Sequence, residues 1–150
     1  MPRFRMLVLC ALAACLLVPT APAAARGSAE DQMVAKINSY RAKHGLPRVR
    51  KSKSLMGSAE RYSWKQMRSG YFGHASHIQA SGKYRRLGEI IAWTDGTAAQ
   101  VSYTFRMWLN SSGHHAIIVD RNFRYVGAGR AAGNFKGRKA SIWTVQFGSR

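Results

Sequence analysis

The sequence predicts an α+β domain, built from three helices and a mainly antiparallel sheet. Apolar side chains recur at helical spacing in segments 28–45, 54–70 and 97–110. Two β-rich runs, 123–130 and 141–147, close the chain, and the glycine-containing segment between them predicts an antiparallel hairpin. Helices that are separated in sequence from such a sheet favour a layered α+β domain.

The first two helices have recognisable ends. Ser28 is expected to cap the first helix, with an acid three residues later at Asp31, and Gly45 is expected to end it. Ser54 is expected to cap the second helix and Gly70 to stop it. A basic linker, residues 48–53, is expected between the two helices.

The middle of the chain alternates between loop, strand and helix. Residues 71–88 contain three glycines and are expected to form a loop. The apolar run 89–93 is typical of a short buried strand. Val101, Phe105 and Trp108 then lie at i, i+4 and i+7 of the third helix, which we expect the polar segment 111–113 to end.

The first 25 residues have the order of a secretory signal peptide. Two arginines precede an apolar run at residues 6–18, and small residues follow at 21–25. Cleavage after Ala23 and cleavage after Ala25 fit equally well. The apolar run is shorter than the ~20 residues that a membrane span needs, which disfavours the alternative of an uncleaved anchor. We therefore expect one domain, residues 26–150, in the periplasm or outside the cell.

Both cysteines, Cys10 and Cys15, lie inside this segment. The exported domain is therefore expected to have no disulfide and to be monomeric. Residues 12–15 resemble a lipoprotein box, but apolar residues continue after Cys15 where a lipid-anchored protein usually has a polar tether. We expect secretion rather than lipid anchoring.

The exported domain is strongly basic. Residues 26–150 hold 22 Lys and Arg against 6 Asp and Glu, a formal charge of +16. The cations cluster at 48–53, 83–86 and 136–139, and we expect anionic envelope polymers, lipids or small ligands as partners of such a surface. Charge that serves solubility alone is the alternative. Export, and the lack of a recognised motif, argue against nucleic acid as a partner.

Five segments of the chain resemble, in order and spacing, those of bacterial members of the CAP superfamily (cysteine-rich secretory, antigen 5 and pathogenesis-related proteins). They are Tyr71–His74, Gly88–Trp93, Trp108–Ile118, Phe123–Gly129 and Trp143–Gly148. The similarity extends from about Met33 to Gly148. It implies a three-layer α-β-α sandwich, which agrees with the element order expected above.

The resemblance also implies a polar cleft that carries two histidines and usually two glutamates. His74 and His114 are similar to the two histidines, and Glu89 to the first glutamate. Asn110 and Ser111 occupy the stretch where many eukaryotic members have the second glutamate, so we include them in the expected cleft. Two isoleucines, Ile90 and Ile117, replace asparagines of the family pattern.

Two imidazoles and a carboxylate could hold a zinc ion with a water as the fourth ligand, or could transfer protons without metal. The spacing of His74, Glu89 and His114 does not decide between these roles. Structural roles, such as an ion pair for Glu89, are alternatives. His114 and His115 are adjacent and point apart, so we expect only His114 in the cleft.

The function that we expect is a non-catalytic ligand-binding module at the bacterial cell envelope, with its site at the His/Glu cleft. A metal-dependent hydrolase that uses Zn²⁺ in the same cleft is one alternative. An electrostatic binder of anionic envelope polymers or lipids is another. The sequence names neither the ligand nor a catalytic residue.

Overall fold

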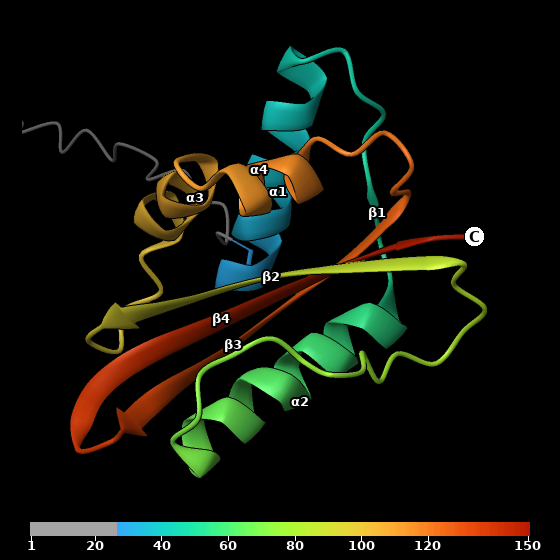
Figure 1. Cartoon of the computed structure of the whole chain (residues 1–150). Helices are drawn as coiled ribbons and strands as arrows, with labels where there is room; N and C mark the ends of the chain where they lie inside the picture. Colours follow the sequence, from blue (N-terminus) through green and yellow to red (C-terminus); the bar gives the residue numbers. More distant parts are fainter. Residues whose placement is uncertain (1–26) are drawn as a thin grey trace, which may run out of the picture.

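A computed structural model describes residues 27–150 and shows a three-layer α-β-α sandwich (Figure 1). The predicted signal segment, with Cys10 and Cys15, lies outside the described residues. Within residues 27–150, no helix has both the length and the apolar character to cross a membrane. The elements are α1 (Ala29–Lys43), β1 (Arg50–Lys51), α2 (Lys53–Ser69), β2 (Arg86–Asp95), α3 (Val101–Leu109), α4 (Ser112–Ile118), β3 (Tyr125–Phe135) and β4 (Arg138–Ser149).

The four strands form one sheet in the order β1-β3-β4-β2. β4 pairs antiparallel with both β2 and β3, while the short β1 runs parallel to β3. The predicted hairpin is confirmed and is longer than expected, because the strands continue to a two-residue turn at Lys136 and Gly137. Both turn residues have positive φ, 51° and 83°, as a tight hairpin turn requires.

The helix ends confirm two of the predicted caps and correct a third. Ser28 Oγ accepts a hydrogen bond from Asp31 N, and Gly70 ends α2 with a φ of 64°. The cap of α2 is Ser52 rather than Ser54, because Ser52 Oγ accepts from Leu55 N. Ser54 instead donates its hydroxyl to the carbonyl of Ser81 in the loop after α2.

Two elements were not predicted. The third helix, α3, ends at Leu109 just before the segment 111–113, as predicted, but Ser111 is the N-cap of a further short helix, α4. Part of the basic segment 48–53 forms β1, where Arg50 and Lys51 pair with Tyr125 and Val126.

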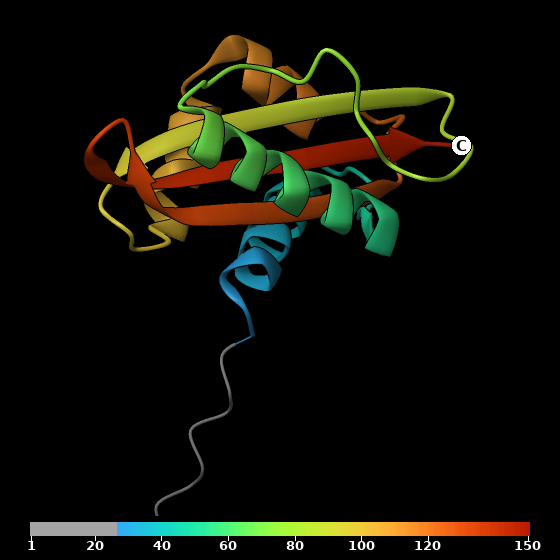
Figure 2. The same ribbon diagram turned by 90° about the horizontal axis from the view of Figure 1, so that it is seen from below.

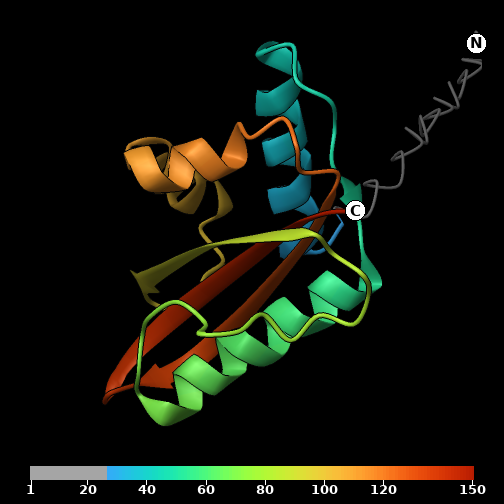
Figure 3. The same ribbon diagram turned by 45° about the vertical axis from the view of Figure 1, so that its right-hand side comes forward.

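The two faces of the sheet carry different helices. α2 alone covers one face, and α1, α3 and α4 gather on the other (Figures 2 and 3). Successive side chains of a strand point to opposite faces. Ile90 and Ala92 therefore join the large apolar core under α1 and α3, whereas Glu89 faces the α2 side with Thr144 and Gln146 of β4.

α2 packs directly on the backbone of β3. A Cβ added at Gly127 would collide with the backbone at Met56, and one added at Gly129 would collide with the backbone at Glu60. Any larger residue would push the helix away from the sheet. This close approach explains why β3 carries glycines at alternate positions on the face toward α2.

Candidate functional site

The structure brings the three predicted cleft residues into one neighbourhood. His74 lies in the loop after α2, Glu89 lies on β2, and His114 lies on α4. His74 Nδ1 is 3.2 Å from Glu89 Oε1. The ring centroids of His74 and His114 are 6.2 Å apart.

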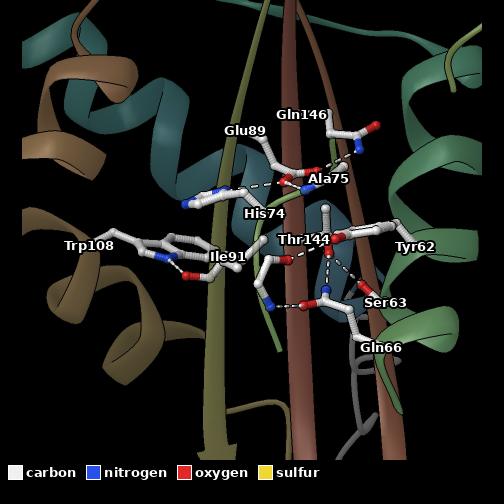
Figure 4. Close-up of polar contacts among 11 residues, drawn as sticks. Tyr62, Ser63, Gln66, His74, Ala75, Glu89, Ile91, Trp108, Thr144 and Gln146 are labelled. Atoms are coloured by element: carbon white, nitrogen blue, oxygen red, sulfur yellow. Dashed lines mark hydrogen bonds and ion pairs between the residues drawn. The ribbon is translucent and has the colours of Figure 1, made fainter. Parts of the chain in front are cut away.

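Glu89 is buried and its carboxylate is surrounded by donors. Oε1 accepts from Ala75 N at 2.9 Å and lies beside His74, while Oε2 accepts from Gln146 Nε2 at 2.9 Å (Figure 4). A buried carboxylate needs such partners, because an unpaired charge away from water is strongly unfavourable. The side chain of Glu89 thereby links the backbone amide of Ala75, the imidazole of His74 and the side-chain amide of Gln146.

Two side chains of α2 clamp the loop that carries His74. Tyr62 donates its hydroxyl to Gly73 O at 2.8 Å, and Gly73 N donates to Gln66 Oε1 at 3.2 Å (Figure 4). Burial and the nearby charge of Glu89 raise the pKa of Tyr62, so its phenol stays protonated and remains a donor. Hydrogen bonds to both its carbonyl and its amide therefore hold Gly73, the residue before His74, in place.

Thr144 of β4 anchors this clamp to the sheet. Its Oγ1 accepts from Ser63 Oγ at 3.0 Å and from Gln66 Nε2 at 3.3 Å. Ser63, Gln66 and Thr144 are all buried. A satisfied buried network of this kind holds its members in one arrangement.

His114 and its neighbour His115 lie in different surroundings. Burial, and to a lesser degree the nearby His74, lower the pKa of His114 below its ordinary value. His114 Nδ1 is buried and has no hydrogen-bond partner within the part of the chain that the structure describes. His115 instead bonds the Tyr40 hydroxyl of α1 through Nε2 at 3.0 Å, so the two imidazoles point apart as expected.

α4, which carries His114, is held by a buried arginine of α1. Arg41 Nη1 donates to the carbonyls of Ile118 and Asp120 at 2.7 and 2.9 Å. Its Nε donates to Pro47 O at 2.9 Å. The guanidinium thereby satisfies carbonyls at the end of α4, where a helix has no internal donors left.

The predicted zinc site has an incomplete set of ligands. Residues 27–150 contain no group of three His, Cys, Asp or Glu side chains that could hold a metal ion. Both oxygens of Glu89 already accept hydrogen bonds, and Nδ1 of His74 is turned toward that carboxylate. Two imidazoles remain available. Zinc binding at His74, His114 and Glu89 therefore stays a prediction.

A cleft of about 560 Å³ opens between α2 and the loop that follows it. His74 and Gln146 line it, and Glu89 lies one hydrogen bond behind both. His114 does not line this cleft, and neither do Asn110 and Ser111, which lie between α3 and α4. The cleft in the structure therefore lies closer to α2 than the cleft predicted from the sequence, which included His114, Asn110 and Ser111.

Three polar residues of this site were missed from the sequence. Tyr62 fits the apolar stripe of its helix, and Gln66 gives no signal of its own. Gln146 follows Val145, which packs in the apolar core. Because strand side chains alternate, Gln146 points to the other face of the sheet, toward Glu89.

The comparisons with known proteins agree with this architecture. The model of the cysteine-rich secretory protein (CAP) family matches residues 34–147. The uncharacterized protein YkwD of Bacillus subtilis is 31% identical over 127 residues, which cover 79% of this chain. The match spans 46% of YkwD, so this chain corresponds to about half of that relative.

Solved structures share the fold at lower identity. An outer surface protein of Borrelia burgdorferi has a TM-score of 0.68 at 19% identity, over 80% of this chain and 91% of its own. An extracellular protein with an SCP domain from Bacillus anthracis has a TM-score of 0.65 at 21% identity, over 81% and 40%. Together with the match to the family model over most of its length, this fold establishes that the chain is a bacterial member of the cysteine-rich secretory protein (CAP) family.

Proposed function

We propose that this protein is an exported, non-catalytic module that binds a small ligand at the cell envelope, in the cleft between α2 and residues 71–79. One observation carries the proposal. His74 lines the cleft on one side and contacts the buried Glu89 on the other, so a side chain at the cleft surface is oriented by a fixed charge. The cleft volume falls in the range of small-molecule sites, ~300–1,000 Å³.

The hydrogen bonds of Glu89 support binding over catalysis. A general base must offer a free oxygen to the proton that it removes. Both oxygens of Glu89 are engaged by donors of the protein itself, and the carboxylate does not line the cleft. Its role in this proposal is to hold His74 and the loop backbone in place.

Export is the second part of the proposal. The order of residues 1–25 is that of a signal peptide, and related domains of this fold are described as an outer surface protein and an extracellular protein. The activity of the longer relatives as whole proteins is not implied, because this chain spans 46% of YkwD and 40% of the Bacillus anthracis chain.

A metal-dependent hydrolase is the second candidate, and one observation favours it. The buried Nδ1 of His114 has no partner among residues 27–150, and its ring lies 6.2 Å from that of His74. Two imidazoles so placed could share a divalent ion whose remaining ligands are waters or substrate. The ion would supply a Lewis acid or an activated water.

The test is a melting-temperature screen of the exported domain against a defined panel of sugars, amino acids, sugar phosphates and short-chain lipids. We expect at least one compound to raise the melting temperature of the wild type but not of His74→Ala. His44→Ala is the matched control, because His44 is an exposed histidine at the end of α1, and it should respond like the wild type. Hits that stabilise all three proteins equally would contradict a site at His74.

Hydrolysis of p-nitrophenyl acetate separates the two candidates. We expect no rate above buffer, with or without added zinc. A zinc-dependent rate that disappears in both His74→Ala and His114→Ala would favour the hydrolase instead.

A further inference from the structure

The charge of the cleft wall points to a class of ligand, on the basis that the cleft is the binding site proposed above. Five of its lining residues are cationic or can become so: Arg61, Lys65, Arg68, His74 and His77. No aspartate or glutamate lines it. Glu89 is buried behind the wall, where its two oxygens accept hydrogen bonds from Ala75 N and Gln146 Nε2.

The arginine and lysine side chains among these five lie on one side of a single helix. Arg61, Lys65 and Arg68 are at i, i+4 and i+7 of α2, so they project from the same face. All three are exposed, and none belongs to an ion pair among residues 27–150. This positive charge is therefore available to a ligand.

The loop opposite α2 is tied to this helix. Arg61 Nη2 donates to Gln79 O at 3.1 Å, which fastens the loop over the cleft. Neutral polar residues line the same space on both sides, Ser58 and Ser69 on α2 and Ser76 on the loop. A ligand in the cleft would thus meet cations on the helix side and neutral polar residues on both sides.

Gln146, which lines the cleft, has an unused acceptor. Its side chain is fully buried and gives its Nε2 to Glu89, while its Oε1 has no partner in the part of the chain that the structure describes. Buried polar atoms in proteins are normally hydrogen-bonded. A turn of this amide toward the cleft would bring the acceptor to a hydroxyl group on a ligand.

We propose that the cleft binds a phosphate group carried by a small hydroxylated molecule, with the phosphate at Arg61, Lys65 and Arg68 and a hydroxyl at Gln146. Phosphate matches this wall better than a single carboxylate, because its several oxygens and higher charge can accept from two guanidinium groups and an ammonium together. The volume of about 560 Å³ exceeds that of a bare phosphate ion and leaves room for its organic part.

Such a group can come from a soluble phosphate ester or from a phospholipid headgroup. Three aromatic side chains at this end of the molecule, Trp64, Tyr71 and Phe72, are exposed. Tyr71 also lines the cleft. Exposed aromatics beside cations are typical of surfaces that meet the headgroup region of an anionic membrane, so the two sources require separate measurements.

Glycerol 3-phosphate is the soluble probe, glycerol is its neutral counterpart, and vesicles of phosphatidylglycerol or phosphatidylcholine are the membrane probes. We expect the wild type to bind glycerol 3-phosphate but not glycerol, measured by calorimetry at low salt. Lys65→Gln/Arg68→Gln should weaken this binding by about tenfold or more, because charge-assisted hydrogen bonds are the strong ones. Neither of these two side chains makes a hydrogen bond within residues 27–150, so the double variant should fold.

The matched control, Lys43→Gln/Lys139→Gln, removes the same charge from exposed positions outside the cleft and should bind as the wild type does. Equal loss in both double variants, or binding of neither glycerol 3-phosphate nor phosphatidylglycerol vesicles, would overturn the proposal. Binding to the vesicles alone would assign the phosphate to a lipid. A neutral compound that binds at His74 while both phosphates fail would overturn this inference and leave the proposed ligand-binding function intact.

Discussion

The two faces of the sheet differ in what their helices cover. Under α1, α3 and α4 lies a large apolar core that includes Phe105, Trp108 and Trp143. Under α2 the apolar cluster is small, and the helix covers buried polar side chains instead, among them Gln66 and Thr144. Apolar packing therefore dominates on the face under α1, α3 and α4, whereas polar side chains that form hydrogen bonds are buried on the face under α2.

This difference explains why the cleft lies beside α2. Apolar packing is non-directional and depends mainly on shape. Hydrogen bonds are directional, so they can hold a side chain or a loop in one defined position. The loop that carries His74 is held by Tyr62, Gln66 and Glu89. Each bond is modest in energy, so substitutions in this hydrogen-bond network should alter the loop and the cleft more than the fold.

The largest expected effect comes from the apolar face. Trp108 is buried and donates Nε1 to Ile91 O at 2.8 Å. Trp108→Ala should lower the free energy of unfolding by about 3–5 kcal/mol, because it leaves a cavity and removes that bond. Urea unfolding measures the loss. Trp64→Ala on the exposed side of α2 is the control, with an expected change within about 0.5 kcal/mol.

The contact between α2 and β3 should give the next largest effect. Gly129→Ala places a Cβ against the backbone of the helix at Glu60, and we expect a loss of about 1–3 kcal/mol in the free energy of unfolding. Gly133→Ala, on the same strand, meets only Met67 at an ordinary contact distance of 3.9 Å. Similar urea midpoints for the two variants would show that α2 does not rest directly on the strand.

The polar clamp should have a smaller effect on stability and a larger one on the loop. Gln66→Ala removes the acceptor of Gly73 N and a bond to Thr144, which should lower the free energy of unfolding by about 0.5–1.5 kcal/mol. Hydrogen exchange should show lost protection at the Gly73 amide and unchanged protection in β3 and β4. Gln79→Ala, whose side chain forms no hydrogen bond within residues 27–150, is the control and should leave the Gly73 amide protected.

The smallest expected effect concerns pH. The pKa of His114 is lowered in the folded state, chiefly by burial, so the unfolded chain binds its proton more readily. The contribution of this group is therefore constant above the unfolded pKa of about 6.5 and turns destabilising as the pH falls below it. The melting temperature should drop less between pH 7.5 and 5.5 in His114→Gln than in the wild type. An equal drop in both proteins would show that His114 does not contribute to the pH dependence of the melting temperature.

Much of the fold could be predicted from residue patterns. Apolar spacing located α1, α2, α3 and the hairpin, because each of these elements buries a face with a regular period. Two elements escaped for physical reasons. β1 spans only Arg50 and Lys51, and no period can be read from two residues. α4 follows α3 through Ser111, because a polar residue that caps a new helix has the same local pattern as one that ends the helix before it.

The site was less predictable than the fold. His74, Glu89 and His114 come together only through the sandwich, and family resemblance rather than their spacing indicated them. Gln146 and Gln66 act through tertiary contacts with Glu89 and with the loop backbone, which leave no local pattern in the sequence. The cleft itself depends on how the loop after α2 folds back, and the glycines of this loop predict its irregular structure but not its path.

A map of backbone amide shifts in ¹⁵N-labelled protein titrated with glycerol 3-phosphate tests the proposed phosphate site most directly. We expect shifts that cluster on residues 58–69 of α2, on the loop 71–79 and at Gln146, and that leave α1, α3 and α4 unchanged. Shifts that spread over basic residues on all sides, or that cluster on the face of α1, α3 and α4, would contradict it.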